Sequence, residues 1–322
     1  MNKVVKYLLA GCMGSLMLTS CFHEDNPPCD SFIRFEYDYN MSYVDLFYKQ
    51  ASVVDLFIFD ANGLYQGFIR QSSSGDTFDQ NYRMTLPRGL SVGTRFIAWS
   101  GLYPESFSYS SLTKGVSTET DLIVALNAAE GAESNQELHP LWYGRLSDAK
   151  LTYTNEVHTI NMVKNTNNIR LVLQSLDPEL EVDEADFTFT FTARNNSYDD
   201  QNNVADNIDR VYVPFLKEND VASRAAVAEL STLRLLEAND NRLLIRRDGQ
   251  ADAILDVNLN YYINALKLSK YSSMPLQEFM DREDEYHVII FLSKGTDPGT
   301  ENVYISSMIS INDWIVREQN EN

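Results

Sequence analysis

Cysteine and histidine are scarce in this chain of 322 residues. The three cysteines all fall near the N-terminus, at Cys12, Cys21 and Cys29. No disulfide can therefore crosslink the rest of the chain, which must fold around its own hydrophobic core. The four histidines are widely separated, so the sequence contains no zinc-binding helix and no two-histidine metal motif. We expect no bound metal.

Positively charged residues are also few compared with negatively charged ones. Lysine and arginine number 26 against 46 aspartates and glutamates, which gives a formal net charge of −20. No lysine-rich or arginine-rich block interrupts this negative field, so we expect no nucleic acid partner. The patterns Gly-x-Ser-x-Gly and Gly-x-Gly-x-x-Gly and the P-loop are missing too, and we expect no cofactor.

The N-terminus has the pattern of an export signal followed by a lipid attachment site. Two lysines begin it, an apolar stretch covers residues 4–18, and residues 18–21 read Leu-Thr-Ser-Cys. The small Thr and Ser fit the site of a lipoprotein signal peptidase. Residues 1–20 are therefore predicted to be a lipoprotein signal peptide, and Cys21 the acylated first residue of the mature protein. An ordinary signal peptide that ends near a cysteine, or a buried apolar strand, is the alternative.

Residues 21–29 are predicted to be a lipidated tether. They are polar and include Pro27 and Pro28, which suits a short extended connection between lipid and a folded body. Each buried methylene of an acyl chain contributes about 0.8 kcal/mol, so more than one chain holds a protein on a membrane. No later stretch approaches the roughly 18 consecutive apolar residues that a helical span needs. We expect a protein that is anchored to a membrane and does not span it.

Short runs with a period of two predict an all-β protein. The clearest run is Phe187–Thr192, in which three Phe alternate with three Thr, and Val53–Phe59 is another. Asp60–Gly63 and Asp248–Gly249 lie between pairs of such runs, and Asn-Gly and Asp-Gly supply the positive φ angles of tight hairpins. Together these patterns favour β-sandwiches.

Helical patterns are few and brief. Three apolar stripes are each predicted to be a short connecting helix, after Asn40, Ser223 and Pro275. The polar stretch 148–157 is the best linker candidate. We therefore divide the chain near residue 155, into an N-terminal sandwich over residues 30–155 and a C-terminal sandwich over residues 156–322.

Carboxylates are the one abundant reactive group. Five of them crowd into residues 278–285. Crowding in sequence does not place two carboxyl groups across a sugar, and such runs are usually solvated helix faces. A lipid-anchored hydrolase that uses Glu278 and Asp281 is therefore a minor alternative, and we expect no enzyme.

Four segments carry a resemblance to a known family: Cys29 with Phe35–Met41, Leu56–Gly63, Gln277–Leu292 and Ile309–Arg317. They resemble segments of the fimbrial anchor subunits of the FimB type, which are lipoproteins that hold fimbrillin-type (type V) pili on Gram-negative outer membranes. The family more often has Gly at the position of Asp313, a departure that affects only the local turn. The likeness is spread from the lipid attachment site at residues 18–21, called a lipobox, to the C-terminus.

This resemblance implies two tandem transthyretin-like β-sandwiches with a few short connecting helices, and no catalysis. It implies a surface-exposed protein of the cell outer membrane, lipid-anchored through Cys21, that holds a fimbria. The partner would be a fimbrillin bound at a strand edge, and the protein would nucleate or terminate assembly and limit fimbrial length. The family-like residues are expected to form a helix–strand corner rather than a partner contact: Gln277, Glu278, Asp281, Arg282, Tyr286, Trp314 and Arg317.

The main alternative is a surface glycan-binding lipoprotein of a polysaccharide-uptake system. Such a protein would share the lipobox and the β-sandwiches. The 18 Tyr, 16 Phe and 3 Trp could build a platform for sugars, but in a sandwich most aromatic residues belong to the core or to cross-strand pairs.

Overall fold

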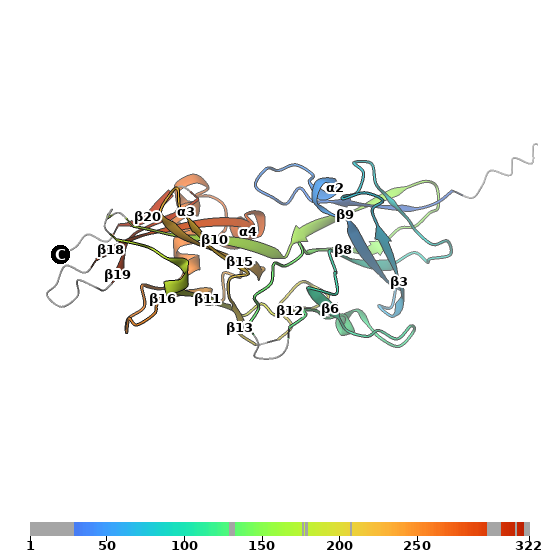
Figure 1. Ribbon diagram of the computed structural model, residues 1–322. Coiled ribbons are helices and arrows are strands. Elements are labelled where there is room, and N and C mark those ends of the chain that lie inside the picture. The colour runs from blue at the N-terminus through green and yellow to red at the C-terminus, as the bar shows by residue number, and fades with distance from the viewer. Residues whose placement is uncertain are drawn as a thin grey trace, which may run out of the picture.

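The computed structural model describes residues 29–128, 133–175, 177, 180–206, 208–294, 304–312 and 314–318. They form two β-rich lobes that follow one another along the long axis of the molecule (Figure 1). The prediction of an all-β protein made of β-sandwiches, with only a few short helices, is confirmed. Cys21 lies outside the described residues. No helix among those residues has the length and the apolar character needed to cross a membrane.

The first lobe is built on a seven-stranded sheet in the order β3-β2-β5-β8-β9-β1-β4. Its strands are β1 (Phe32–Glu36), β2 (Val53–Phe59), β3 (Tyr65–Ser72), β4 (Met84–Thr85), β5 (Thr94–Ser100), β8 (Trp142–Ala149) and β9 (Val157–Lys164). β9 joins two parts of this sheet, because it pairs with β1 along its first half and with β8 at its end. Side chains from both parts, among them Phe35, Leu56 and Trp142, form one buried cluster with Phe47 of α2 (Phe47–Gln50).

A second layer covers the other face of β2 and β5. It is a three-stranded sheet in the order β12-β7-β6, made of β6 (Phe107–Tyr109), β7 (Val124–Leu126) and β12 (Ser197–Tyr198), with the short turn η2 (Glu119–Asp121) beside it. β12 belongs to the C-terminal half of the chain, yet it pairs with β7 of the N-terminal half. The ring of Trp99 lies 6.2 Å from that of Tyr198. The two halves of the chain therefore share one core.

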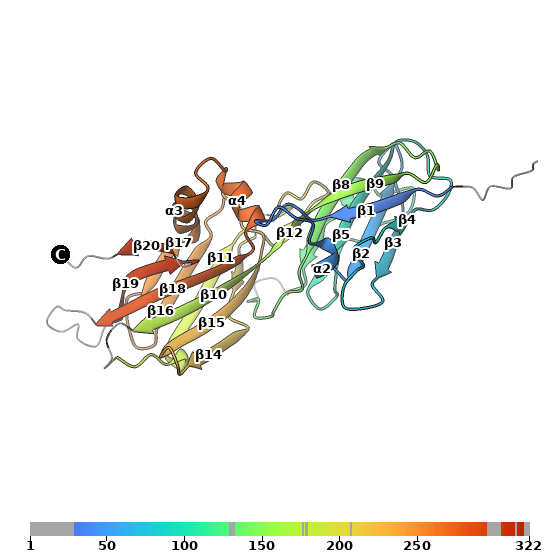
Figure 2. The ribbon, with the colours of Figure 1, turned by 90° about the horizontal axis from the view of Figure 1, so that it is seen from above.

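The second lobe packs a six-stranded sheet against a four-stranded one. The first has the order β14-β15-β10-β18-β19-β20 and the second the order β13-β11-β16-β17. Their strands are β10 (Thr166–Ser175), β11 (Phe187–Ala193), β13 (Arg210–Tyr212), β14 (Leu216–Asp220), β15 (Ala225–Leu233), β16 (Arg242–Arg247), β17 (Leu255–Asn258), β18 (Glu285–Lys294), β19 (Tyr304–Ile311) and β20 (Trp314–Glu318). The remaining elements are η3 (Glu184–Asp186), α3 (Leu259–Lys270) and α4 (Leu276–Arg282). Figure 2 shows both helices on one flank of the lobe.

The alternating pattern in β11 is reproduced in its burial. Phe187, Phe189 and Phe191 are buried, and they belong to the same cluster as Ile169 and Leu171 of β10. The intervening threonines face away from this core. Both predicted hairpins are confirmed as well, because β2 pairs with β3 and β16 pairs with β17 in antiparallel fashion.

The helix predicted after Ser223 is wrong. Residues Ala225–Leu233 form β15, which pairs with β10 on one side and β14 on the other. Eight of its nine residues are buried. A strand that is covered on both faces is apolar at consecutive positions, so its sequence loses the alternation that identifies a strand. The helix after Pro275 is confirmed as α4, whereas the one after Asn40 is reduced to the four residues of α2.

The change of lobe occurs about ten residues later than residue 155, where we expected it. Val157–Lys164 forms β9, which pairs with β1 and β8 of the first lobe rather than opening the second sandwich. β10 begins at Thr166 in the second lobe, so only Asn165 separates the two strands. The polar stretch that suggested a linker is instead a turn inside the first lobe, where the Glu156 carboxylate accepts hydrogen bonds from the backbone N–H groups of Thr152, Tyr153 and Thr154.

Candidate functional site

Five of the seven family-like residues meet at one corner of the second lobe. Asp281 of α4 forms two hydrogen bonds of 2.7 Å with the guanidinium of Arg234, which directly follows β15. The Asp281 side chain is only 7% exposed and that of Arg234 only 16%. A charge pair this deeply buried must be fully hydrogen-bonded, since removing either partner leaves an uncompensated charge.

Gln277 completes this pair. Its side-chain amide donates to Oδ1 of Asp281 at 2.8 Å and to the carbonyl of Leu235 at 3.0 Å, and its carbonyl accepts from the N–H of Glu237 at 2.8 Å. The α4 helix is thereby fastened to the segment that follows β15. The described partners of the Gln277 and Asp281 side chains all lie within the second lobe.

Arg282 reaches from the same helix into the first lobe. Its guanidinium carbon lies 4.0 Å from the centre of the Tyr39 ring and 4.7 Å from that of Tyr43. Its Nε also donates to Glu278 at 2.9 Å. Such cation–π contacts contribute about 0.5 to 2 kcal/mol each. Arg282 and Glu278 therefore belong to the contact between the lobes.

Charged groups also cross the junction beside Arg282. Lys164 at the end of β9 forms an ion pair with Asp284, which precedes β18. The neighbouring Glu283 is partly buried, and burial, reinforced by Asp284 and Glu285, raises its pKa to about 7. Tyr286 is fully buried and donates to the carbonyl of Glu283 at 3.1 Å. Trp314 and Arg317 lie in β20, on the other side of β19 from β18.

A second set of polar contacts, not predicted from the sequence, ties the lobes on the side of β12. Arg145 of β8 forms ion pairs with Glu119 and with Asp200, the latter at 2.7 Å. The hydroxyl of Tyr143 donates to the carbonyl of Asp200 at 2.7 Å. Arg145 and Tyr143 precede Asp200 by 55 and 57 positions in the sequence. No local pattern could have identified them.

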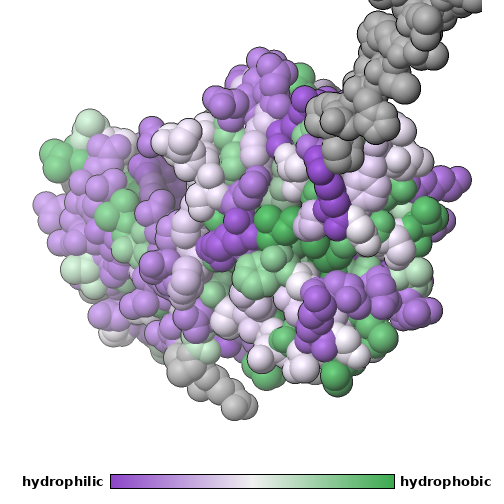
Figure 3. Space-filling view, turned by 90° about the vertical axis from the view of Figure 1, so that its right-hand side faces the viewer, coloured by the Kyte–Doolittle hydropathy of each residue, from purple (hydrophilic) through white to green (hydrophobic). Residues whose placement is uncertain are grey.

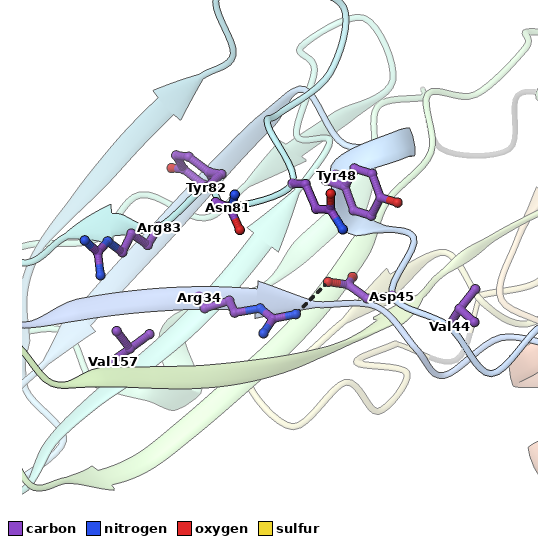
Figure 4. A pocket seen from close by; sticks show the side chains of 9 residues that line it. Arg34, Val44, Asp45, Tyr48, Asn81, Tyr82, Arg83 and Val157 are labelled. Carbon is purple, nitrogen blue, oxygen red and sulfur yellow. Dashed lines mark hydrogen bonds and ion pairs between the residues drawn. The ribbon is translucent and has the colours of Figure 1, made fainter.

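A surface groove with a volume of about 810 Å³ lies along β1 in the first lobe. β4 pairs only with Phe32 and Ile33, so the later part of β1 is left beside this groove. Figure 4 shows Arg34 and Asp45 joined by their ion pair on one side, with Tyr48 beside them. The groove is lined by polar, charged and aromatic residues: Arg34, Val44, Asp45, Tyr48, Gln80, Asn81, Tyr82, Arg83 and Val157.

The outer end of the first lobe is the face nearest the start of the described chain. Figure 3 shows a mixed surface there, in which apolar side chains gather in small groups among polar ones. Within the parts of the chain that the structure describes, no three His, Cys, Asp or Glu residues are grouped so that they could hold a metal ion. Cys29 is a free, partly exposed thiol.

An all-β body of two interlocked lobes, in which the polar motif residues serve as internal ties, has the construction of a structural or binding protein. Comparison with known families gives the same class. The family model described as "Fimbrillin-A associated anchor proteins Mfa1 and Mfa2" matches residues 25–320. The chain belongs to this family, which is a family of fimbrial anchor proteins and not of enzymes.

Solved structures agree with this assignment. A candidate adhesin from Bacteroides thetaiotaomicron is 34% identical, with a TM-score of 0.75 over 92% of this chain and 100% of that one. A candidate polysaccharide-binding protein from the same species is 30% identical, with a TM-score of 0.77 over 91% and 99% of the two chains. The fimbrial anchor protein Mfa2 from Porphyromonas gingivalis shares the fold, with 15% identity and a TM-score of 0.70 over 90% and 99%. A search of curated proteins found no match.

The buried Arg234–Asp281 pair generates a stability prediction. Asp281→Ala should lower the free energy of unfolding by about 3 to 5 kcal/mol, because it leaves the Arg234 charge buried without a partner. Urea denaturation followed by circular dichroism measures this change. The matched control is Asp256→Ala, which breaks a doubly hydrogen-bonded pair with Arg242 on the exposed surface. The control should lose far less stability. Equal losses of unfolding free energy in the two variants would show that the buried pair contributes no more to stability than the exposed pair.

Proposed function

We propose that this protein is an outer-membrane lipoprotein that holds the base of a fimbria on the cell surface. The observation that carries the proposal is the match to the fimbrillin-associated anchor family over residues 25–320, which begins four residues after the lipobox cysteine. Acyl chains on Cys21 would supply the membrane attachment, and residues 22–29 the tether. A fimbrillin subunit is the partner.

The orientation of the lobes supports this arrangement. In Figure 2 the strand β1 starts at the outer end of the first lobe and runs toward the second lobe. A lipid attached eleven residues before Phe32 would therefore lie at the outer end of the first lobe. The second lobe then points away from the membrane and offers its sheet edges to the fimbria.

The two edges of the six-stranded sheet differ in character. β14 reads Leu-Lys-Glu-Asn-Asp, and charges on an edge strand discourage the addition of another strand. β20 reads Trp-Ile-Val-Arg-Glu, which has an apolar beginning. We assign β20 as the edge that pairs with a fimbrillin strand, because main-chain hydrogen bonds at an open edge are a general mode of recognition. An anchor that offers one such edge would nucleate or terminate the polymer and limit its length.

Lipid attachment is tested by Cys21→Ala, with Cys29→Ala as the matched control. The first variant should move the protein out of the membrane fraction and release fimbriae, abnormally long, into the medium. The second should leave both unchanged. Immunoblots of cells and medium, with filament lengths from electron microscopy, give the result. Fimbriae that stay on washed Cys21→Ala cells at the normal level would contradict the anchor.

The edge assignment is tested by Val316→Pro. The register of β19 and β20 shifts beside Val316, which has no paired residue, and proline is tolerated at such bulges. The added ring should block an incoming strand and reduce retention of fimbriae on cells while the thermal unfolding midpoint stays near that of the native protein. Val221→Pro, in the exposed turn that follows β14 at the opposite edge, is the matched control. Equal retention in both variants would exclude β20 as the docking edge.

A glycan-binding lipoprotein is the second candidate function, and the groove beside β1 favours it. Tyr48 offers an aromatic face there, and Arg34 and Asn81 offer polar groups. Tyr82 is less available, since its ring stacks on Phe78 at 4.1 Å and its hydroxyl donates to Gln71. Isothermal titration with bacterial and plant polysaccharides decides the question. Binding that is lost in Tyr48→Ala and kept in Tyr261→Ala, an exposed tyrosine of the second lobe, would favour the glycan reading.

A further inference from the structure

We propose that the β1–β9 ladder is a mechanical clamp, loaded in shear, that carries tension between the N-terminal tether and the second lobe. The proposal rests on the function proposed above, because it takes the lipid to be at the N-terminal end and the fimbria at the second lobe. An anchor that carries no tension would not need this clamp. The geometry of β1, β9 and β10 carries the argument.

β1 and β9 run parallel to each other. The paired residues are Phe32 with Val157, Ile33 with His158, Arg34 with Thr159, Phe35 with Ile160 and Glu36 with Asn161. In a parallel pair the N-terminal end of one strand and the C-terminal end of the other lie at opposite ends of the ladder. The tether pulls on the beginning of β1, and the second lobe pulls on the end of β9.

These two pulls act along the strands in opposite directions. Every hydrogen bond between β1 and β9 is then strained at the same time, and β1 cannot detach until all of them break together. An antiparallel pair would place both pulling points at one end, and the bonds would open one after another. Forced unfolding is governed by the rate of barrier crossing and not by equilibrium stability. The parallel arrangement therefore matters even though parallel pairing is slightly weaker per residue.

The loaded end of β1 is fastened by side chains as well as by the ladder. The N–H of Phe32 donates to the carbonyl of Glu156 at 3.0 Å. The hydroxyl of Ser31 donates to the Glu156 carboxylate at 2.6 Å, and Arg88 forms an ion pair with Asp30 at 2.9 Å. These bonds hold the residues just before β1 to the first lobe. They add resistance at the point where the tension enters.

The far end of β9 delivers the load to the middle of a sheet. Asn165 alone separates β9 from β10, and β10 lies between β15 and β18 in the six-stranded sheet. Asn165 is fully buried, its N–H donates to Leu141 at 2.7 Å, and its carbonyl accepts from Arg234 at 2.8 Å. The pairing of β10 with β18 is again parallel and extends over eight residues. The path of tension thus contains no flexible linker between the lobes.

Single-molecule force spectroscopy tests the clamp with two pulling geometries. The chain from Phe22 to Asn322 contains one cysteine, Cys29, which serves as the first handle. Val221→Cys places the second handle in an exposed turn near the end of β10, because Gln174 pairs with Ala225. Asn155→Cys instead places it opposite the beginning of β1 and opens the ladder from one end.

The first geometry should rupture at about twice the force of the second, or more, because all bonds of the ladder share the load. The first rupture should release the chain between Asp30 and Val53, which has a contour length of about 80 Å at ~3.5 Å per residue. The lengthening is this contour length minus the distance that the segment already spans in the fold. Equal forces in the two geometries, or a first event without this lengthening, would overturn the proposal.

A matched pair of variants tests the ladder bonds themselves. Phe32 directs its N–H toward β9, so the alternation of a strand directs that of Arg34 the same way. Arg34→Pro removes this donor together with the ion pairs to Glu36 and Asp45, whereas Arg34→Ala removes only the ion pairs. The proline variant should lose most of the difference in force between the geometries, and the alanine variant should keep it. Identical behaviour of the two variants would contradict the clamp.

Cells separate this proposal from the function on which it rests. If the protein is a clamped anchor, Arg34→Pro cells should keep fimbriae in still medium and shed them under flow, while Arg34→Ala cells keep them in both. If deletion of the gene leaves fimbriae on the cells, the anchor function fails whatever the forces are. If Cys21→Ala sheds fimbriae but the two pulling geometries rupture at equal force, the anchor function stands and the clamp fails.

Discussion

The direct passage of β9 into β10 at Asn165 is the constraint on which the rest of the structure depends. A single residue cannot act as a hinge when it is fully buried and its backbone N–H and carbonyl are both bonded. Its side-chain amide is also paired with that of Asn202. The direction in which the first lobe ends therefore fixes the direction in which the second begins. The pairing of β12 with β7 and the stacking of Arg282 on Tyr39 become possible only because this direction is fixed.

The polar contacts between the lobes have a cost that an apolar junction would not have. Burying Lys164 with Asp284, and Arg145 with Asp200, removes charges from water, and a well-packed apolar replacement is often as stable. An apolar junction, however, tolerates sliding, whereas a doubly hydrogen-bonded pair is satisfied in only one geometry. In an anchor that carries tension, as proposed above, one fixed geometry matters more than a gain in stability. We read these networks as devices that set the relative position of the lobes.

The features that could be predicted from the sequence are those that depend on residues close together along the chain. The alternation of Phe187–Thr192 and the turn at Asp60–Gly63 identified strands and a hairpin, because a half-buried strand and a tight turn each have a local signature. β15 was missed, since burial on both faces removes the alternation. In the site, the contact of Glu278 with Arg282 spans four positions and could be expected, but Arg234 lies 47 positions before Asp281. No spacing rule reaches that far, and only the folded chain brings the two together.

The unequal sheet edges bear on how an anchor differs from a shaft subunit. A subunit with one strand to give and one edge to receive forms an unlimited filament, because each addition recreates the binding surface. A subunit with a single open edge can only begin or end a filament. In this chain β4 has two residues, β14 carries charges, and the first residue of β3 is bonded to the carbonyl of Ser117. Each of these features weakens an edge as a template. β20, at the end of the molecule away from the start of β1, begins with three apolar residues and is the edge proposed above for the fimbrillin strand. The polymer would then meet the anchor at one place and in one orientation.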